Sequence, residues 1–429
     1  MHYDNLYFEI NQRIFFGGNL LANSDIFIYV FSIQHSAGPM QNTKTEIKKA
    51  DVVIIGAGVI GCSIAYYLCK CGITDVVMIE KEEFPGSGST SRANGGIRAQ
   101  FTTEANIQMS LLAMDLLDGM DEEMRSQSGY TKAGYLFLTA EKDNLRQLEK
   151  NIKFQKGLSV SVEFISKEEI KTQYPYIRCD DLLGGSFGSR DGFIDSGGLT
   201  NAYYSQALSM GAKMLKNTDV TGLTISNDCV KGVHTSDGKI KAEWVVNAAG
   251  PFAANVAQWA KIDVPVQPCR RNILMTGPTP DLPAIIPMTV DMDTGLLARR
   301  EGKGISLAGS NPDDTQGFES SFDHDFIEWI APKMEKRFPQ LEEAGIDFSK
   351  CWAGLYPETP DHHAILGESG VSGFLLATGL GGHGIMHAPA VGYLMSEMVE
   401  KGKVESLNFS AFELTRFEKG LANVEKAVL

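Results

Sequence analysis

DVVIIGAGVIGCSIAYYLCKCGITDVVMIEK, residues 51–81, is the stretch that decides the fold of this chain. A β-branched apolar run at 52–55 leads directly into G-x-G-x-x-G, an apolar pattern at helical spacing covers 64–71, and a second β-branched run at 75–79 ends on Glu80. Apolar runs this short predict buried strands. The stretch therefore predicts a strand–helix–strand unit that binds a dinucleotide.

The glycines and the acidic residue of this unit have separate tasks. Gly56 permits a tight turn, Gly58 lets a pyrophosphate approach the backbone, and Gly61 lets the helix pack closely on the strand. The N–H groups that open the helix are expected to face the phosphates. Glu80 is placed to accept hydrogen bonds from a ribose, which argues against a ligand that carries a 2′-phosphate. The cofactor contacts expected in this unit are Gly56, Ala57, Gly58, Val59, Ile60, Gly61, Glu80 and Lys81.

Length, charge and cysteine usage narrow the class of protein. The 429 residues are 43% hydrophobic and 21% charged, which predicts a globular enzyme of two domains. The net charge of −14, from 39 basic and 53 acidic residues, argues against a nucleic-acid partner. The seven cysteines are scattered, and no pair has the spacing of a metal site. We therefore expect no bound metal, and free thiols in a reducing, cytoplasmic environment.

Residues 1–45 do not share the pattern of the rest. The apolar octet 26–33 is too short to span a membrane, and a single arginine before it, Arg13, is a poor start for a secretory signal. Met40 precedes the first predicted strand at the distance usual for this architecture. We expect an unstructured extension or a start at Met40, with a cleaved signal as the alternative.

Three further stretches rich in glycine or other small residues belong with the first unit. The stretch 85–98 joins glycines to small hydroxyl residues, which suits close contact with a phosphate or a ring. The buried strand 244–246 ends in small residues at 247–251, and the strand 374–377 leads into GLGGHG at 379–384. Small residues at the carboxyl edge of an open α/β sheet are where such a fold admits its ligand. We assign residues 50–100, 200–255 and 350–429 to a discontinuous nucleotide-binding domain, and 101–199 and 256–349 to a second domain.

The intervening sequence predicts helices and turns with recognisable ends. Ser166 is a good N-cap for a short helix, and Asp237-Gly238 marks a hairpin turn. Thr103 stands at the start of a helix predicted to run to residue 124, although Asn106 does not complete a capping box. Further helices are predicted at 141–156, 198–210 and 322–338 and from Ala388, and strands of a second sheet within 264–309.

Five blocks in this order resemble the FAD-dependent D-amino-acid oxidase superfamily: DVVIIGAGVIGCSIAYYL, STSRANGGIRAQF, VVNAAGPFA, GLYPETPDHHAILGE and TGLGGHGIMHAPAVG. The chain is most similar to the branch with sarcosine oxidase β chains, L-proline dehydrogenase β chains and cyanide-forming glycine dehydrogenase chains. The resemblance implies an α/β fold: a Rossmann-type FAD-binding domain and a second α+β substrate domain built on a mixed β-sheet. It also implies that the C–N bond of a small amino acid such as sarcosine, proline or glycine, with a secondary amine expected, is oxidised by hydride transfer to flavin N5, giving an imine.

The resemblance also implies cofactor contacts beyond the first unit. One loop would lie below the pyrophosphate and isoalloxazine, one strand end would line the site, and a second glycine-rich loop would point a helix N-terminus at the flavin N1–C2=O. The adenine contact rests on spacing only. These contacts are Ser91, Arg92, Asn94, Gly95 and Gly96 in the first loop, Val220 at the adenine, Ala248 and Gly250 at the strand end, and Gly379, Gly381, Gly382, His383, Gly384 and Ile385 in the second loop.

Departures from the family pattern narrow the expected chemistry. Monomeric sarcosine oxidases link flavin to a cysteine at a place that is Gly354 here, and Cys351 nearby is expected to be a buried thiol, so we expect non-covalent FAD. The lysine that assists dioxygen in those oxidases has no counterpart in the run 304–307, which carries Ser306. Their carboxylate-binding lysine falls on Met386. These differences argue against sarcosine and against oxidase activity, and favour the proline-dehydrogenase-like branch.

An amino-acid substrate needs a cation for its carboxylate in a largely dry pocket. Arg98, at the end of the loop expected under the flavin, is the first candidate, and Arg300 is the second, since arginine pairs both carboxylate oxygens. His383 is a candidate proton acceptor or a hydrogen-bond partner of flavin or backbone. His362 and His363 are too few ligands for a metal.

Two other functional classes fit parts of the sequence. One is a flavoprotein hydroxylase or hydroxy-acid oxidoreductase, which shares the dinucleotide motif but not the later blocks. The other is a non-catalytic FAD-bound assembly factor, since a mitochondrial relative of this branch helps build respiratory complex I. The partners expected for the enzyme are a small amino-acid or amine substrate and an electron-transfer acceptor or α-type partner chain, without a nucleic acid and without a membrane span.

Overall fold

An eight-stranded sheet centred on β1 forms one of the two domains. In the computed structural model, which describes residues 47–311 and 315–427, β1 pairs in parallel with β2 on one side and with β11 on the other. The strand order is β17-β18-β11-β1-β2-β8, and β10 and β9 extend the sheet from β11. The strands are β1 (Lys49–Ile55), β2 (Val76–Ile79), β8 (Lys213–Leu215), β9 (Val220–Ser226), β10 (Cys229–Thr235), β11 (Gly238–Asn247), β17 (Ile365–Glu368) and β18 (Phe374–Thr378). The extension predicted for residues 1–45 lies outside the described residues.

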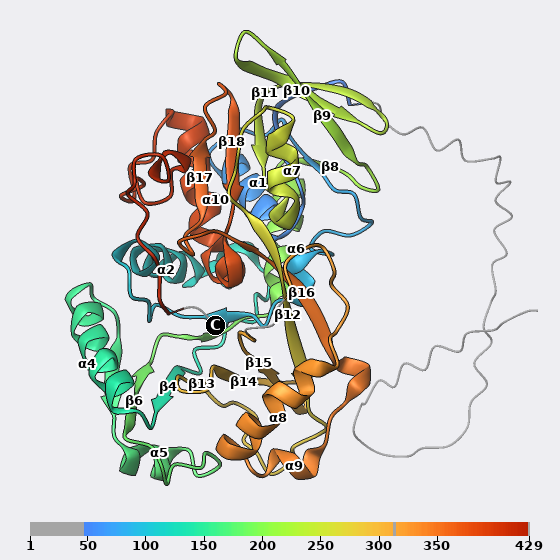
Figure 1. Cartoon of the computed structure of the whole chain (residues 1–429). Coiled ribbons are helices and arrows are strands. Elements are labelled where there is room, and N and C mark those ends of the chain that lie inside the picture. Colours follow the sequence, from blue (N-terminus) through green and yellow to red (C-terminus); the bar gives the residue numbers. More distant parts are fainter. Residues whose placement is uncertain (1–46, 312–314, 428–429) are drawn as a thin grey trace, which may run out of the picture. The chain divides into compact units, whose positions relative to one another are not determined.

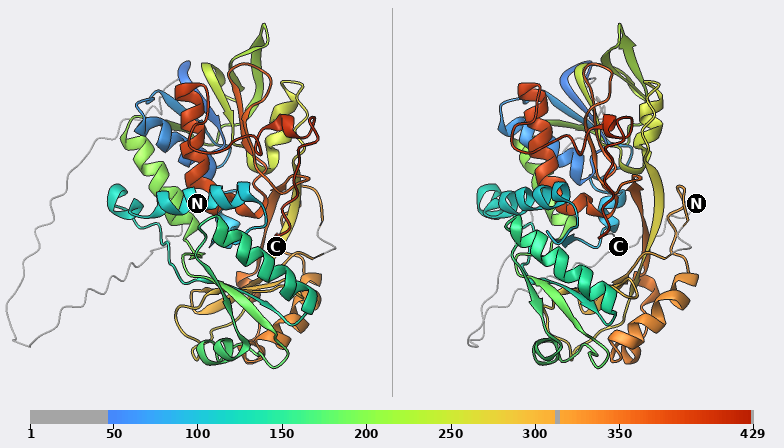
Figure 2. Two further views of the ribbon diagram at one scale, coloured as in Figure 1. Left: turned by 90° about the vertical axis from the view of Figure 1, so that its left-hand side faces the viewer. Right: turned by 60° about the vertical axis from the view of Figure 1, so that its left-hand side comes forward.

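Helices cover both faces of this sheet (Figure 1; Figure 2). Val52 and Ile54 share a core with four helices on one face, whereas Val53 and Ile55 face α7 on the other. Because both faces are covered there, β1 is apolar and buried without interruption from Val52 to Ile55, whereas Lys49 and Asp51 at its start are exposed. The helices are α1 (Val59–Lys70), α2 (Glu104–Leu117), α6 (Ser196–Ser209) and α10 (Gly384–Lys401) on the first face and α7 (Ala253–Gln258) on the second.

A second eight-stranded sheet forms the other domain and confirms the mixed sheet predicted for it. Its order is β16-β12-β15-β14-β13-β4-β6-β5; β13 and β4 are parallel, and the other neighbours are antiparallel. Its strands are β4 (Tyr135–Thr139), β5 (Val162–Ile165), β6 (Gly184–Gly188), β12 (Gln267–Met275), β13 (Met288–Asp291), β14 (Leu296–Glu301), β15 (Gly304–Ala308) and β16 (Trp352–Glu358). The helices α4 (Lys142–Gly157), α5 (Lys167–Gln173), α8 (Asp325–Arg337) and α9 (Leu341–Ala344) accompany it. A two-stranded pair, β3 (Gly96–Ile97) with β7 (Gly192–Phe193), stands apart from both sheets.

Local predictions were confirmed at caps and turns but not at every helix end. Ser166 forms a capping box at α5, and Asp237-Gly238 joins β10 to β11. The single helix predicted for 103–124 was wrong, because Gly119 adopts a left-handed φ of 83° that separates α2 from α3 (Met120–Met124). The last long helix, α10, begins at Gly384 and not at Ala388, continuous with a 3₁₀ turn over Gly381–His383.

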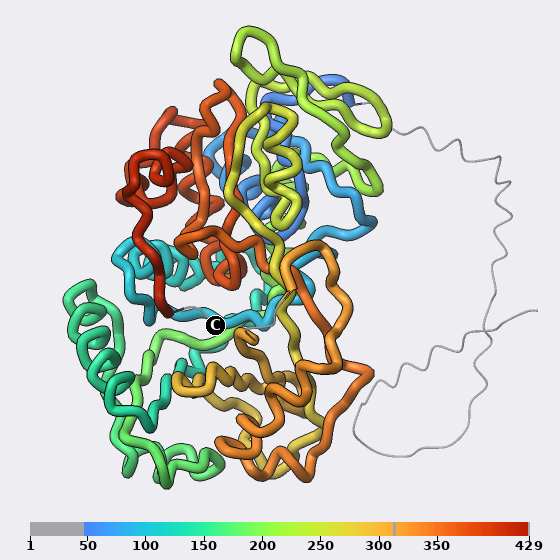
Figure 3. The backbone as a smooth tube through the Cα atoms, viewed as in Figure 1, coloured from blue at the N-terminus to red at the C-terminus, as the bar shows by residue number. Residues whose placement is uncertain are grey.

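The chain crosses between the two sheets several times, as the trace in Figure 3 shows. Two of the predicted segments therefore contribute to both domains. β16 belongs to the second sheet although it lies within 350–429, and α2, within 101–199, packs on α10. Among the helices described, none combines the length and the apolar character needed to cross a bilayer.

Candidate active site

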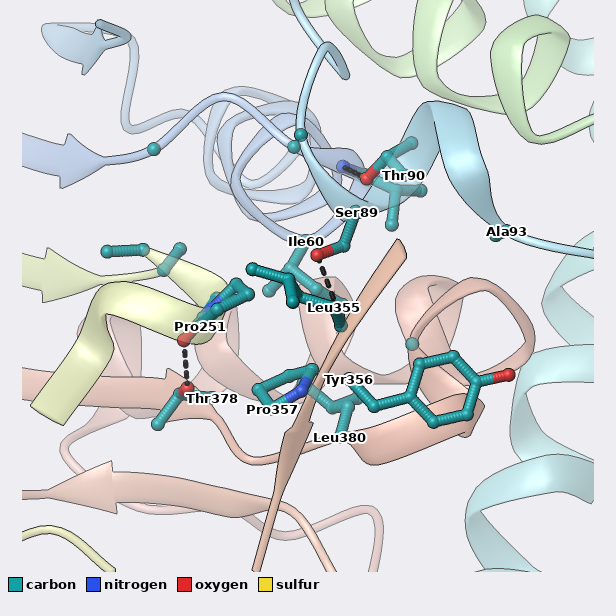
Figure 4. Close-up of a pocket in the computed structure, with 18 of the residues that line it drawn as sticks. Ile60, Ser89, Thr90, Ala93, Pro251, Leu355, Tyr356, Pro357, Thr378 and Leu380 are labelled. Atoms are coloured by element: carbon teal, nitrogen blue, oxygen red, sulfur yellow. Dashed lines mark hydrogen bonds between the residues drawn. The ribbon is translucent and has the colours of Figure 1, made fainter. Parts of the chain in front are cut away.

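A cavity of about 680 Å³ lies where the carboxyl ends of β1, β2, β11 and β18 face the second sheet. Figure 4 shows Leu355, Tyr356 and Pro357 of β16 against this cavity, with Ser89 donating to the Leu355 carbonyl (2.7 Å). Most of the predicted contacts line it: Gly56, Gly58, Val59, Ile60, Glu80, Lys81, Arg92, Asn94, Gly95, Gly96, Arg98, Val220, Ala248, Gly250, Gly381, Gly382, His383, Gly384 and Ile385.

The glycines of the first unit lie where side chains would collide with backbone. A Cβ on Gly56, whose φ is 100°, would come 2.6 Å from the Ala248 carbonyl oxygen. A Cβ on Gly61 would come 2.0 Å from the Gly56 carbonyl oxygen, so Gly61 packs under the turn and does not line the cavity. The helix that follows, α1, has no side-chain N-cap, and Thr90 Oγ1 accepts from the Val59 N–H at 3.1 Å. The N–H groups at its N-terminal end can therefore bind a pyrophosphate.

Glu80 lines the cavity at the end of β2 and is already held in place by main-chain donors. One carboxylate oxygen accepts from the Ala57 N–H at 2.9 Å and the other from the Glu82 N–H at 3.1 Å. A carboxylate oxygen has more than one acceptor site, so both oxygens can still accept a ribose hydroxyl. Ala57 itself acts through this bond and is not part of the lining.

The second glycine-rich loop brings the N-terminus of α10 to the same cavity. Gly381 has a φ of 49°, and a Cβ on Gly382 would come 2.6 Å from the Tyr356 ring. α10 spans 18 residues, so its N-terminal end carries the positive end of a long helix dipole. This end can stabilise the negative charge that gathers on a reduced flavin. Gly379 packs against Thr359 behind the loop and lies outside the lining.

Arg98 lies in the cavity wall with only 2% of its surface exposed. Its Nη1 donates to the Gln100 carbonyl at 2.5 Å, its Nη2 donates to the Ala427 carbonyl, and the guanidinium carbon is 4.0 Å from the centre of the Phe101 ring. Within the described part of the chain no carboxylate forms an ion pair with it. The cation is thus held by neutral acceptors and remains able to pair with an anion from the cavity.

Arg300, the second cation predicted, does not reach the cavity. Its Nη1 donates to the carbonyl and the hydroxyl of Thr279, away from the lining. The neighbouring Arg299 points the other way and donates to the Asn94 carbonyl. Successive side chains of a strand alternate between its faces, and neither of these two arginines of β14 lines the cavity.

His383 is buried in the cavity wall with its ring edge against Phe101, the centroids 4.8 Å apart. Burial, together with the nearby Arg98 guanidinium, holds the pKa of His383 well below its usual range. The imidazole is therefore neutral near pH 7 and can accept a hydrogen bond, whereas its surroundings disfavour the protonated form. His362 and His363 pair with Glu358 and Asp361, and the described residues contain no cluster of three or more potential metal ligands.

Cysteine does not line the cavity in the described residues. Cys351 accepts from the Met275 N–H and is directed at the Asp347 carbonyl, away from the lining. Gly354 faces Arg92, whose guanidinium donates to the Ala353 carbonyl at 2.7 Å. Ser91 donates to main-chain carbonyls within its own loop and also lies outside the lining.

Several lining residues were missed because they come from the second sheet. Tyr135 on β4, Met288 on β13 and Leu297 on β14 form an apolar wall next to Arg98, and Tyr356 and Met386 also line the cavity. Burial raises the pKa of Tyr135, so its hydroxyl keeps its proton. In the sequence these positions look like ordinary core residues, and only the pairing of β13 with β4 brings them together.

A Rossmann-type turn, a ribose-binding acid and a helix N-terminus converge on one cavity under a mixed sheet, which defines a two-domain flavin-dependent oxidoreductase. The chain belongs to the DAO family of FAD-dependent oxidoreductases, whose profile matches residues 51–398, and its cofactor is FAD. The Cβ-free turn, Glu80 and the α10 N-terminus fit the pyrophosphate, ribose and flavin of that cofactor.

Three comparisons describe the relatives. The chain is 30% identical to "FAD-dependent oxidoreductase domain-containing protein 1" of Xenopus laevis, over 86% of this chain and 83% of that protein. It is 28% identical to mitochondrial sarcosine dehydrogenase of Homo sapiens, over 87% of this chain but 42% of that protein. The crystal structure of L-proline dehydrogenase from P. horikoshii superimposes with a TM-score of 0.82 at 31% identity, covering 88% of this chain and 100% of that one.

Proposed function

We propose that this protein is an FAD-dependent dehydrogenase of a small, secondary amino acid such as proline, with glycine as the primary counterpart. The observation that carries the proposal is Arg98, a buried cation in the cavity wall that is held by carbonyls and not by a carboxylate. The similarity to L-proline dehydrogenase supports the same substrate class.

Arg98 binds the substrate carboxylate in this proposal. Its remaining N–H donors form a planar fork that can pair both carboxylate oxygens. A charge-assisted hydrogen bond contributes about 1.5–3 kcal/mol. The low exposure of the site strengthens this bond, because little water competes for it. The apolar wall of Tyr135, Met288 and Leu297 excludes water and favours an aliphatic side chain or ring.

The amine nitrogen must lose its proton before or as the C–N bond is oxidised. His383 is neutral in the cavity wall and can accept a hydrogen bond from the amine, although its lowered pKa makes it a weak base for the proton itself. Bound FAD would supply the acceptor for the hydride of the α-carbon, and the oxidised substrate would be an imine. The N-terminus of α10 lies at the cavity to stabilise the negative charge that results.

We also propose that electrons leave to an acceptor other than dioxygen, such as an electron-transfer protein or an α-type partner chain. The position of the oxygen-assisting lysine of monomeric sarcosine oxidases is taken by Ser306, which is fully buried and donates to Asn94 Oδ1 at 2.8 Å. All seven cysteines are free thiols, which suits a reducing compartment such as the cytoplasm.

Anaerobic bleaching of the flavin tests the proposal. The purified protein is mixed without oxygen with secondary amino acids, primary amino acids, the same amines lacking the carboxylate, and hydroxy acids, and the flavin absorbance is followed. Bleaching by a secondary amino acid at the lowest concentration is expected. Bleaching by hydroxy acids alone would replace the proposal with an alcohol oxidation, and no bleaching by any amine would favour a non-catalytic FAD-bound factor.

A further inference from the structure

The segment 421–427 lies next to the stretch that follows β3, although the two are far apart in the sequence. Figure 1 shows this dark red segment descending from the nucleotide-binding domain to end beside the blue segment near residue 100, and Figure 2 shows the same neighbourhood from two other sides. The contact is made by hydrogen bonds that span more than 300 residues of sequence.

Glu425 fixes this segment to the N-terminus of α2. Its carboxylate has no exposed surface and accepts from the N–H groups of Thr102 (2.9 Å) and Thr103 (3.0 Å), from the Thr103 hydroxyl (2.7 Å) and from Asn106 Nδ2 (3.4 Å). The α2 helix has no cap from its own Thr103 side chain. Glu425 therefore caps α2 from a distance, with an acid at the positive end of the helix dipole.

The same segment continues from this cap to the substrate cation. The Ala427 N–H donates to Glu425 Oε1 at 2.9 Å, and the Ala427 carbonyl accepts from Arg98 Nη2. With Nη1 bound to the Gln100 carbonyl and the guanidinium over Phe101, the orientation of the fork is set by these contacts. The residue between them adds a second anchor, since the Lys426 N–H donates to Thr102 Oγ1 at 3.0 Å, but the Glu425 carboxylate makes most of the bonds that hold this segment on α2.

We infer that Glu425 is a positioning residue for the substrate carboxylate: it locks residues 425–427 on α2 so that the Ala427 carbonyl orients Arg98 towards the cavity. The inference rests on the proposed function, because it deepens the role of Arg98. A bidentate pair needs the fork held close to its productive orientation. Releasing a long side chain from one orientation weakens a bond it makes by roughly two- to tenfold.

The test uses the holoenzyme and the variant Glu425→Gln, which keeps the shape of the side chain and removes its charge. The ligands are pyrrole-2-carboxylate, a carboxylate with no hydride to lose, and pyrrole as the same ring without the carboxylate. Their dissociation constants are measured from the shift of the flavin spectrum, together with FAD content and melting temperature. Binding of these ligands does not require turnover, so the inference can be judged even if the proposed reaction fails.

Glu397→Gln is the matched control. Glu397 is also buried at 3% exposure and holds main-chain N–H groups, those of Glu405 and Ser406 at 3.2 Å, but it contacts none of the Arg98 neighbourhood. The expected result is a roughly three- to tenfold weaker binding of pyrrole-2-carboxylate in Glu425→Gln, no change for pyrrole, and no change for either ligand in the control. KM for a carboxylate substrate should rise while kcat is kept.

Two results would overturn the inference: unchanged pyrrole-2-carboxylate binding in Glu425→Gln, or equal losses for pyrrole and its carboxylate. If Glu425→Gln does not fold, the same binding measurements are made on Ala427→Pro. It removes the N–H that donates to Glu425 but leaves the cap on α2 intact. Selective weakening of the carboxylate ligand in Ala427→Pro supports the inference, and unchanged binding refutes it.

Discussion

Burying a charge without a partner is costly, so a guanidinium at 2% exposure must find acceptors. Arg98 finds two main-chain carbonyls and the face of Phe101. Neutral acceptors satisfy the donors without cancelling the charge. That distinguishes Arg98 from Arg337 and Arg416, which are buried in ion pairs with Asp291 and Asp361.

Arg98→Met is expected to raise the apparent constant for a carboxylate substrate by roughly ten- to a hundredfold, because it removes a charge-assisted, bidentate bond. Arg98→Lys keeps the charge without the fork and should cost less. Steady-state kinetics with each substrate and with its analogue lacking the carboxylate measure this. Equal losses for both would mean that Arg98 supports the flavin and not the carboxylate.

Buried histidines predict how stability depends on pH. Burial, with the Arg98 charge, lowers the pKa of His387 to about 3 and holds that of His383 well below its usual range. Between pH 6.5 and 3 the unfolded chain therefore binds more protons at these sites, and stability falls as pH drops. Asp191 has the opposite and weaker effect. Burial raises its pKa to about 6, so its protonation stabilises the folded state as the pH falls towards the ordinary pKa of an aspartate.

His387→Gln should flatten this dependence. Each such histidine accounts for about 2 kcal/mol between pH 7 and pH 5, at 1.36 kcal/mol per pH unit below its ordinary pKa near 6.5. Urea denaturation at both pH values measures it, with the exposed His324→Gln as control. If wild type and His387→Gln lose the same free energy of unfolding between pH 7 and pH 5, protonation of His387 does not cause the pH dependence.

Single residues could be predicted where the backbone conformation requires a residue type, as in a tight turn. They could not be predicted where the role depends on the direction in which a side chain points from its strand. Gly56 and Gly61 are specified by the turn that they form, so the motif placed them. Arg300 was named as the second candidate for the carboxylate, and excluding it required the orientation of β14, which no local pattern contains. Tyr135 could not be separated from a core residue without the pairing of β4 and β13.

At the scale of elements, the contact of α1 with the turn before it depends on Gly61. A Cβ there would come 2.0 Å from the Gly56 carbonyl oxygen, so Gly61→Ala should move the helix away from the turn. We expect a loss of about 1–3 kcal/mol of stability and most of the bound FAD. The flavin-to-protein absorbance ratio and urea denaturation measure these two effects.

Gly157→Ala is the control for this change, because a Cβ at Gly157 meets no atom within 4 Å. It should leave FAD content unchanged. A Gly61→Ala protein with full flavin content would show that the turn tolerates the displacement and that the close packing is not required for binding.

The elements themselves were largely predictable from their own ends. The first strand–helix–strand unit, the capping box at α5 and the turn between β10 and β11 each carry a local signal. The N-terminus of α2 does not, because its cap is Glu425, far along the chain. The break at Gly119 was missed since a glycine in an apolar helical pattern is compatible with continuation.

At the scale of the whole molecule, both sheets contribute walls to the FAD cavity. The cofactor should therefore hold the two domains together, and its removal should lower the stability of both. Free FAD at about a hundred times its dissociation constant is expected to stabilise the apoprotein by about 2.7 kcal/mol. Calorimetry of apoprotein titrated with FAD measures this.

A melting temperature that does not change with FAD would contradict this prediction. A mixture of AMP and riboflavin, which can bind the adenosine and flavin ends of the site without linking them, is the control. The order of blocks along the sequence predicted the discontinuous domain, but not that β16 joins the second sheet. The partners of β16 on β12 lie 79–91 residues earlier in the sequence, so this pairing is decided by burial across the finished fold and not by a local pattern.

The bond between Arg98 and Ala427 also fixes when the substrate site can exist during synthesis. The two residues are 329 positions apart. At about 5–20 residues per second, a ribosome needs on the order of half a minute after making Arg98 to supply its acceptor. During that interval the proposed carboxylate cation lacks this acceptor. The lining of the FAD cavity extends to Met386, so it is complete about 40 residues before Ala427 is made.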